Sequence, residues 1–91
     1  MPDAGRRLIL MDGTQIEDGS CGYADRRLWC YVKNYTMPQA AQVFLDPSKT
    51  GKIIFQYGDM SDEYDGFTYC TNIFLDEDQV SVCLRKGVQD V

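Results

Sequence analysis

The segment "YTMPQAAQVFLDP", residues 35–47, is the one stretch of this 91-residue chain with convincing helical signals. Thr36 can cap the helix, Gln39 completes a Thr-x-x-Gln capping box, and Pro38 suits the first turn. The apolar residues that follow give the helix one flank to bury, and the proline at the end of the segment stops it. We therefore predict one short helix near residues 37–45, in a chain that otherwise consists of short strand segments.

The first strands precede this helix. Asp12-Gly13 is a strong hairpin signal, and a two-residue turn at this point places Ile9 opposite Ile16 on an apolar face. The Gly-rich residues 18–25 that follow are predicted to form a loop. The chain is thus expected to begin with a hairpin and then a loop.

The segment "RRLWCYVKN" predicts a strand with two different faces. Leu28, Cys30 and Val32 share one face, whereas Trp29 and Tyr31 share the other. We expect the two aromatic residues to pack in the core under the helix, because a small sheet has two sides to cover. Docking a partner or stacking bases is the alternative, but no flanking basic stripe supports nucleic-acid stacking.

Beyond the helix, "DPSKTG" predicts a turn and "KIIFQYG" predicts a strand. The last two strands, in residues 67–75 and 79–87, are predicted to form a hairpin across the acidic tripeptide 76–78. This hairpin pairs Leu75 with Val80, Ile73 with Val82, and Thr71 with Leu84. Its other face carries both Cys70 and Cys83.

Together these segments predict an α+β fold that is mainly an antiparallel β-sheet. About five to six strands form the sheet or a small open barrel, and the helix near residues 37–45 covers one face. Residues 1–91 are expected to form a single domain, because a chain of this length is too short to enclose two hydrophobic cores.

The chain contains no histidine, which removes Ser-His and Cys-His catalysis as well as histidine-ligated metals. The segment "DPSKTGK" lacks the first glycine of a phosphate-binding loop, and it lacks the Ser or Thr after the Gly-Lys pair. We therefore predict that the protein is not an enzyme.

Seven acidic residues, and no Lys or Arg, lie between residues 53 and 84: Asp59, Asp62, Glu63, Asp65, Asp76, Glu77 and Asp78. The segment "GDMSDEYDG" does not have the register of a calcium-binding EF-hand loop. Two interpretations remain open for it: a solvated loop, or an acidic contact surface shared with residues 76–78 that attracts a basic partner. The whole chain has a formal charge of −5, and direct binding of nucleic acid through this acidic half is disfavoured because phosphate would meet a negative field there.

Four cysteines raise the question of a metal site, although no CxxC pair is present. A turn near residues 25–26 would place Cys21 almost opposite Cys30, and the last hairpin would make Cys70 and Cys83 diagonal neighbours. One structural zinc bound by all four is therefore an alternative to four small buried hydrophobic residues. The leading prediction has no cofactor.

No apolar run approaches the roughly 20 residues that span a bilayer, and the start of the chain does not resemble a secretory signal. We expect a cytoplasmic protein, a monomer or homodimer that does not bind membranes. Its cysteines are then reduced thiols.

The segments "LILMDGTQIE", "LWCYVKNYTMPQAAQVFLDPSKTGKIIFQYG" and "YDGFT" resemble small proteins carried by phages and prophages of Firmicutes. In those proteins a "DGT" hairpin is followed by a "T-M-x-x-A-x-x-x-F-x-D-P-x-K-T" helix and turn, and the similar elements cover residues 8–86. Some small acidic phage proteins of this kind are anti-CRISPR inhibitors, which bind the type II effector nuclease and block DNA loading or cleavage. No residue role carries over from this resemblance.

The resemblance thus implies a non-enzymatic phage accessory protein that binds and inhibits a larger basic host protein in the infected cell. An effector nuclease holds nucleic acid in a positively charged channel, so an acidic ligand has a physical reason to bind there. The alternative is a structural component of the phage particle, such as a tail accessory subunit, which would self-assemble through sheet edges and aromatic residues.

Overall fold

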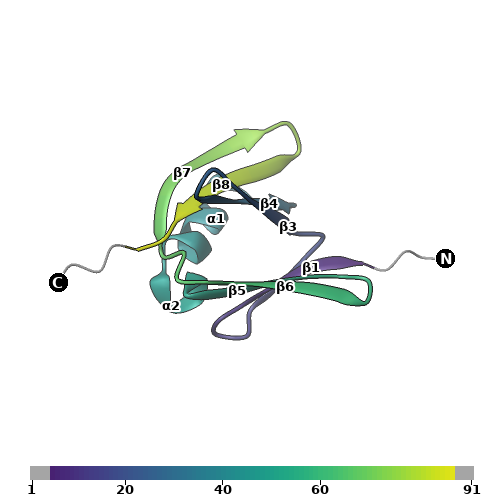
Figure 1. Cartoon of the computed structure of the whole chain (residues 1–91). Coiled ribbons are helices and arrows are strands. Elements are labelled where there is room, and N and C mark those ends of the chain that lie inside the picture. The colour runs from purple at the N-terminus through teal and green to yellow at the C-terminus, as the bar shows by residue number, and fades with distance from the viewer. Residues whose placement is uncertain (1–4, 88–91) are drawn as a thin grey trace.

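The structure is a computed structural model that describes residues 5–87, and within them eight strands form two four-stranded antiparallel sheets (Figure 1). Sheet A has the order β2–β1–β5–β6, with β1 (Arg6–Leu10), β2 (Gln15–Glu17), β5 (Lys52–Tyr57) and β6 (Met60–Asp65). Sheet B has the order β3–β4–β8–β7, with β3 (Ser20–Ala24), β4 (Arg27–Lys33), β7 (Tyr69–Asp76) and β8 (Gln79–Arg85). Two short helices, α1 (Met37–Phe44) and α2 (Pro47–Thr50), connect β4 to β5.

The α+β class with mainly antiparallel sheet is confirmed, but the number of strands and their grouping differ from expectation. Eight strands, not five to six, divide into two open sheets, and the described residues form no closed barrel. The pairings that build both sheets join distant segments, because β1 pairs with β5 and β4 pairs with β8. The partners in such pairings cannot be identified from local turn signals.

Helix α1 forms as predicted. The Thr36 hydroxyl accepts a hydrogen bond from the Gln39 N–H, and the Gln39 side chain accepts one from the Thr36 N–H, so the capping box is complete. The predicted turn after it is instead the short helix α2. Asp46 caps α2 by accepting from the Ser48 N–H at 3.0 Å, and Pro47 occupies its first position.

The β1–β2 hairpin exists, but its predicted register is wrong by one residue. Leu8, not Ile9, lies opposite Ile16. The turn has three loop residues rather than two, because Leu10 N–H donates to the Thr14 carbonyl and Gly13 adopts a positive φ of 91°. The shift sends Leu8 and Leu10 into the core with Ile16.

Two segments predicted as loops are strands. Residues 20–24 form β3, which pairs with β4 across a two-residue turn whose members, Asp25 and Arg26, both have positive φ. Residues 60–65 form β6, an edge strand that pairs along its whole length with β5. Its sequence has no apolar alternation because it is exposed, and charged side chains suit an unpaired sheet edge.

The last hairpin is confirmed over most of its length, with Leu75 opposite Val80 and Ile73 opposite Val82. The predicted pair of Thr71 with Leu84 is wrong, because a bulge at Thr71 shifts the register. The Thr71 hydroxyl donates to the Cys83 carbonyl at 3.2 Å, which replaces part of the interrupted ladder.

The core lies between the two sheets. Leu8, Ile16 and Ile53 from sheet A meet a second set of buried residues from sheet B, which comprises Leu28, Cys30, Val32, Val80, Val82 and Leu84. Helix α1 adds Ala40 and Phe44 to the same cluster and packs against β7 and β8, while α2 packs against α1 and β5 (Figure 1). The helices therefore fill one side of the space between the sheets.

This position of α1 overturns the expectation for Trp29 and Tyr31. The helix covers the inner face of sheet B, whereas the two aromatic residues alternate with the buried Leu28, Cys30 and Val32 and lie on the outer face. Among the described residues, no helix or strand covers that outer face.

Candidate binding surface

The outer face of sheet B, which points away from sheet A, is built from three adjacent strands. Strand β4 contributes Trp29 and Tyr31, and β8 contributes their cross-strand neighbours Cys83 and Ser81. On the far side of β8, β7 contributes Asn72 opposite Cys83 and Phe74 opposite Ser81. The result is two rows of side chains that run across the three strands. Cys83 is at the centre of one row and Ser81 is at the centre of the other.

The small central residues are covered even though no element lies over them. Ser81 is 2% exposed and Cys83 is 1% exposed. Trp29 and Tyr31 are half-buried, and each lines a depression of the surface.

A depression of about 360 Å³ lies at one end of this face. Within the part of the chain that the structure describes, its lining combines two cations, one aromatic ring, three small or polar side chains and no acidic residue: Arg27, Trp29, Thr71, Asn72, Cys83 and Arg85. We call it the arginine pocket. The β4–β8 register brings Arg27 and Arg85 next to each other, since Leu28 pairs with Leu84 immediately beside them.

A second depression of about 250 Å³ lies at the other end of β4, beside Tyr31. It is lined by two further cations, one acid and three polar residues: Arg6, Lys33, Asp18, Ser20, Tyr31 and Gln79. The two hollows thus frame the aromatic residues of β4 with four cations. Sequence reasoning missed this surface because its cations come from three strands and are not consecutive.

The acidic residues of β6 are distributed differently from the sequence expectation. Alternation along the strand places Asp62 on one face and Glu63 with Asp65 on the other. Glu63 forms an ion pair with Lys52 of β5 at 3.1 Å, although no cation neighbours it in sequence. The Asp62 carboxylate accepts a hydrogen bond from the Tyr57 hydroxyl at 3.1 Å, which raises the pKa of Tyr57.

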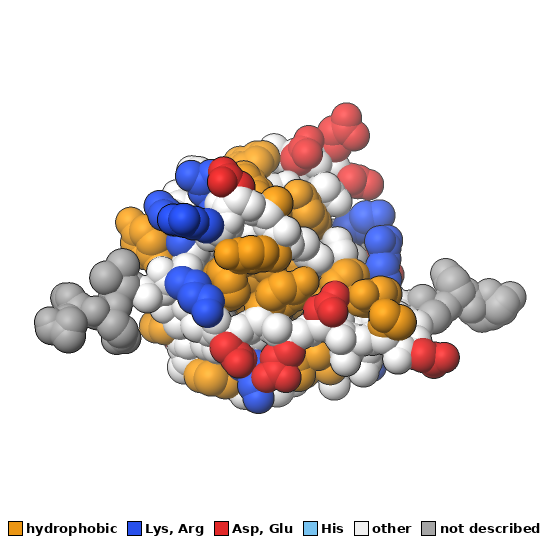
Figure 2. Space-filling model, in the orientation of Figure 1, with side chains coloured by type: hydrophobic (Ala, Val, Ile, Leu, Met, Phe, Trp, Pro, Cys, Tyr) orange, Lys and Arg blue, Asp and Glu red, His pale blue; other side chains and the backbone are white. Residues whose placement is uncertain are grey.

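The other acidic residues sit in turns. Asp59 lies in the β5–β6 turn, and Asp76, Glu77 and Asp78 form the tip of the β7–β8 hairpin. Figure 2 shows acidic side chains gathered at this tip, apart from those over β6 in the lower half of the view. The seven residues therefore do not form one acidic surface.

The cysteines do not converge as the zinc alternative requires. Cys21 lies directly opposite Cys30, which confirms that part of the prediction. The bulge at Thr71, however, pairs Cys70 with Leu84 and turns it toward the core, while Cys83 faces the outer side. Residues 5–87 contain no group of three or more potential ligands that could hold a metal ion.

Cys30 is fully buried, and the hydrogen bond with Cys21 together with burial raises its pKa well above the usual range of a thiol. Burial also raises the pKa of Cys70. Both thiols are therefore protonated and weakly nucleophilic at neutral pH.

Neither α1 nor α2, the helices formed by residues 5–87, has the length and apolar character needed to cross a bilayer. Comparisons of the chain with protein-family models, curated proteins and solved structures found no match.

Proposed function

We propose that this chain is a non-enzymatic accessory protein that binds a larger partner with a basic surface and inhibits it. The tip of the β7–β8 hairpin, which we call the acidic tip, is its contact site. The resemblance to small phage proteins suggests an anti-CRISPR protein that acts in the cytoplasm of the infected bacterium and blocks nucleic-acid loading of an effector nuclease.

The observation that carries this proposal is the arrangement of Asp76, Glu77 and Asp78. All three side chains are exposed, they are consecutive, and none joins an ion pair within the described residues. Their charge is therefore available to a partner. In contrast, part of the charge of β6 is already compensated by Lys52.

The acidic tip is also supported by a buried strand that is paired on both sides. Strand β8 is buried on both faces from Val80 to Leu84, and it pairs with β4 on one side and β7 on the other. A charged loop on a rigid strand pair loses little conformational entropy on binding. Acidic groups in this position accelerate encounter with a positively charged channel.

The test compares two triple variants with the same change in charge. Asp76→Asn/Glu77→Gln/Asp78→Asn neutralises the acidic tip, and Asp59→Asn/Asp62→Asn/Asp65→Asn neutralises the β5–β6 hairpin. Association with a purified type II effector nuclease is measured at several salt concentrations, together with DNA cleavage. We expect the tip variant to associate roughly tenfold more slowly and to inhibit less, and the control variant to retain most of its activity. Equal effects of the two variants, or no binding by the wild type, would contradict the proposal.

A structural component of a phage particle is the second candidate, and the edge strand β7 favours it. Tyr69, Phe74 and Leu75 are 58%, 44% and 61% exposed on this strand, whose outer backbone edge is unpaired in the sheet order. Exposed apolar edges promote strand-to-strand assembly. Size-exclusion chromatography separates the candidates, because a ring or ladder of species indicates the particle component and a monomer or dimer indicates the inhibitor.

A further inference from the structure

We propose that the outer face of sheet B binds single-stranded nucleic acid, with phosphates held in the arginine pocket and bases stacked on Trp29 and Tyr31. The arginine pocket lies at the opposite end of sheet B from the acidic tip, and this inference goes beyond the proposed function.

The first argument is the charge of the arginine pocket. Arg27 and Arg85 are neighbours on adjacent strands, and like charges in that relationship repel each other. Among residues 5–87 the lining includes no carboxylate, and Arg27 forms one ion pair, with Asp25 at 3.4 Å, which is exposed to solvent and weak. An anion between the two guanidinium groups would relieve the repulsion, and phosphate matches their planar donor geometry.

The second argument is the position of the aromatic rings. Trp29 lines the same pocket as the two arginines, so a nucleotide whose phosphate occupies the pocket has its base beside the indole. Tyr31 lies two residues further along β4, about 6.6 Å away by strand geometry, which is comparable with the spacing of nucleotides in an extended strand. Aromatic platforms of this kind stack bases without requiring a particular sequence.

The third argument is that the cations and aromatic rings continue along β4 from the arginine pocket to the second depression. Beyond Tyr31, the second depression supplies Arg6 and Lys33 for a further phosphate, although Asp18 lowers its positive charge. Thr71 and Asn72 line the arginine pocket and offer hydrogen-bonding groups to a base edge. A path of cation, ring, ring and cation along one strand suits two or three nucleotides of a single strand. A duplex is a poorer fit because its bases are already stacked.

The formal charge of −5 does not prevent the binding of single-stranded nucleic acid, because the charges are unevenly distributed over the molecule. The acids of the last hairpin lie at its tip, at the Lys33 end of the sheet, whereas Arg27 and Arg85 lie at the opposite end. We therefore expect modest affinity with strong salt dependence.

The test uses a fluorescently labelled ten-nucleotide oligothymidylate and the complete chain at low salt. Because Trp29 is the single tryptophan, stacking should also quench the intrinsic fluorescence in a saturable way. We expect Trp29→Ala to weaken binding by roughly 5- to 150-fold, as loss of one stacked base implies. Trp29→Phe, which preserves a ring and should fold normally, should retain most of the affinity.

The charge variants provide a matched pair. Arg27→Gln/Arg85→Gln should reduce the slope of log affinity against log salt by about 0.7, since the two arginines share one phosphate and each phosphate contact of a single strand contributes about 0.7. Arg7→Gln/Lys52→Gln removes the same charge from sheet A, where both cations are paired with carboxylates, and should leave the slope nearly unchanged. Equal slopes for both variants would overturn the assignment of this face.

Three other probes test which class of ligand this face binds. A hairpin duplex should bind more weakly than the single strand, and thymidine monophosphate should bind far more weakly. A polyglutamate peptide that binds the wild type as tightly as the oligonucleotide would overturn the proposal in favour of an acidic protein segment. Absence of saturable binding by the wild-type chain at low salt would overturn it altogether.

Discussion

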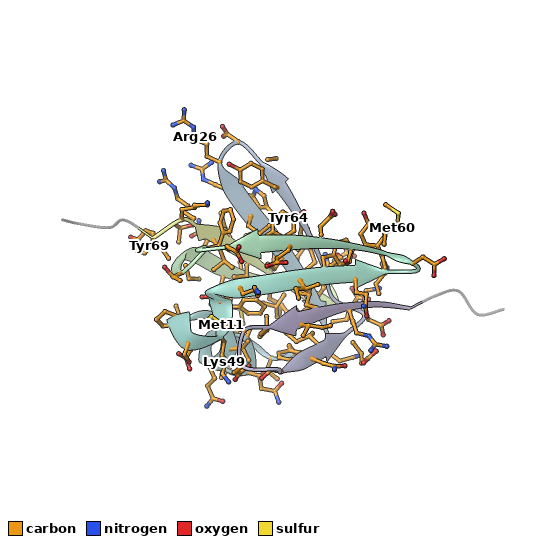
Figure 3. The ribbon with its side chains drawn as sticks, turned by 60° about the horizontal axis from the view of Figure 1, so that its bottom comes forward. Met11, Arg26, Lys49, Met60, Tyr64 and Tyr69 are labelled. Atoms are coloured by element: carbon orange, nitrogen blue, oxygen red, sulfur yellow. The ribbon has the colours of Figure 1, made fainter. Side chains whose placement is uncertain are left out.

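The Lys49 ammonium group lies 2.5 Å from the Asp12 carboxylate, and this pair joins the β1–β2 turn to helix α2 across 37 residues of sequence. The Met11 N–H donates to the Lys49 carbonyl at 2.9 Å in the same place, and Figure 3 shows the Met11 and Lys49 side chains at the same edge of the molecule. The hairpin turn is therefore fastened to the helix by both backbone and side-chain contacts.

The first prediction concerns the pH dependence of this contact. The hydrogen bond from Lys49 holds the pKa of Asp12 well below its usual range. A lowered carboxyl pKa stabilises the folded state above the unfolded pKa of about 4, and that contribution is lost as the pH falls toward the folded-state pKa. We therefore expect Asp12→Asn to lower the urea midpoint at pH 7, with the difference from wild type shrinking below pH 4.

The matched control for this experiment is Asp78→Asn, at an exposed position of the acidic tip. It should change the free energy of unfolding by no more than about 0.5 kcal/mol at pH 7. A difference between wild type and Asp12→Asn that stays constant from pH 7 to pH 3 would show that the ion pair does not contribute.

The second prediction concerns the capping box of α1. Thr36→Ala removes the acceptor of the Gln39 N–H and should lower the free energy of unfolding by about 1 kcal/mol. Gln42→Ala, at an exposed position of the same helix, should have little effect. Urea denaturation followed by circular dichroism measures both, and equal stability of Thr36→Ala and wild type would exclude a stabilising cap.

The third prediction contrasts two glycines. Gly66 has a φ of 83°, its N–H donates to the Gly51 carbonyl, and its own carbonyl accepts from Thr68 and Gly87. Gly66→Ala should therefore cost about 1 to 2 kcal/mol, because an L side chain is strained at positive φ. Gly22, in β3, has no atom within 4 Å of an added Cβ and no positive φ.

Gly22→Ala should accordingly leave the stability unchanged or raise it by up to about 1 kcal/mol, since alanine loses less backbone entropy in a strand. Thermal and urea unfolding of the two variants give the comparison. A larger loss of stability for Gly22→Ala than for Gly66→Ala would contradict the expectation that the positive φ of Gly66 is the more demanding of the two.

The fourth prediction concerns thiol reactivity. Cys70 is half-buried, whereas Cys21, Cys30 and Cys83 are buried. Under native conditions a maleimide should therefore modify Cys70 first, and Cys30 should be among the slowest because it is fully buried and its pKa is raised. Mass spectrometry of a time course identifies the sites, and labelling in urea should modify all four. Native labelling of Cys30 at the rate of Cys70 would require a more open β3–β4 hairpin.

Much of the candidate site was visible in the sequence as separate parts. The position of Trp29 and Tyr31 on one strand face followed from alternation, and the position of the acidic tip followed from the predicted last hairpin. The pairing of Arg27 with Arg85 beside Trp29 did not follow, because it depends on the register between β4 and β8, which are about fifty residues apart. For that reason the sequence showed no basic stripe beside Trp29, although the structure places two arginines next to it.

Local chemistry by itself determined the elements whose signals lie within a few residues. The capping box and Pro47 fixed helix α1, alternation fixed the two faces of β4, and the apolar pairs fixed most of the last hairpin. Such signals act through the conformation and hydrogen bonds of neighbouring residues, so they are present before the chain is folded.

Only the tertiary structure decided how these elements combine. Strand β6 forms because it pairs with β5, and strand β3 forms because it pairs with β4. Neither segment has a strong alternation of apolar and polar residues of its own. The bulge at Thr71 likewise arises from the pairing of β7 with β8. It places Cys70 and Cys83 on opposite faces of sheet B. Strand pairing satisfies backbone groups across long sequence separations and buries one face of each sheet against the other. These contributions depend on the whole assembly, so no short segment encodes them.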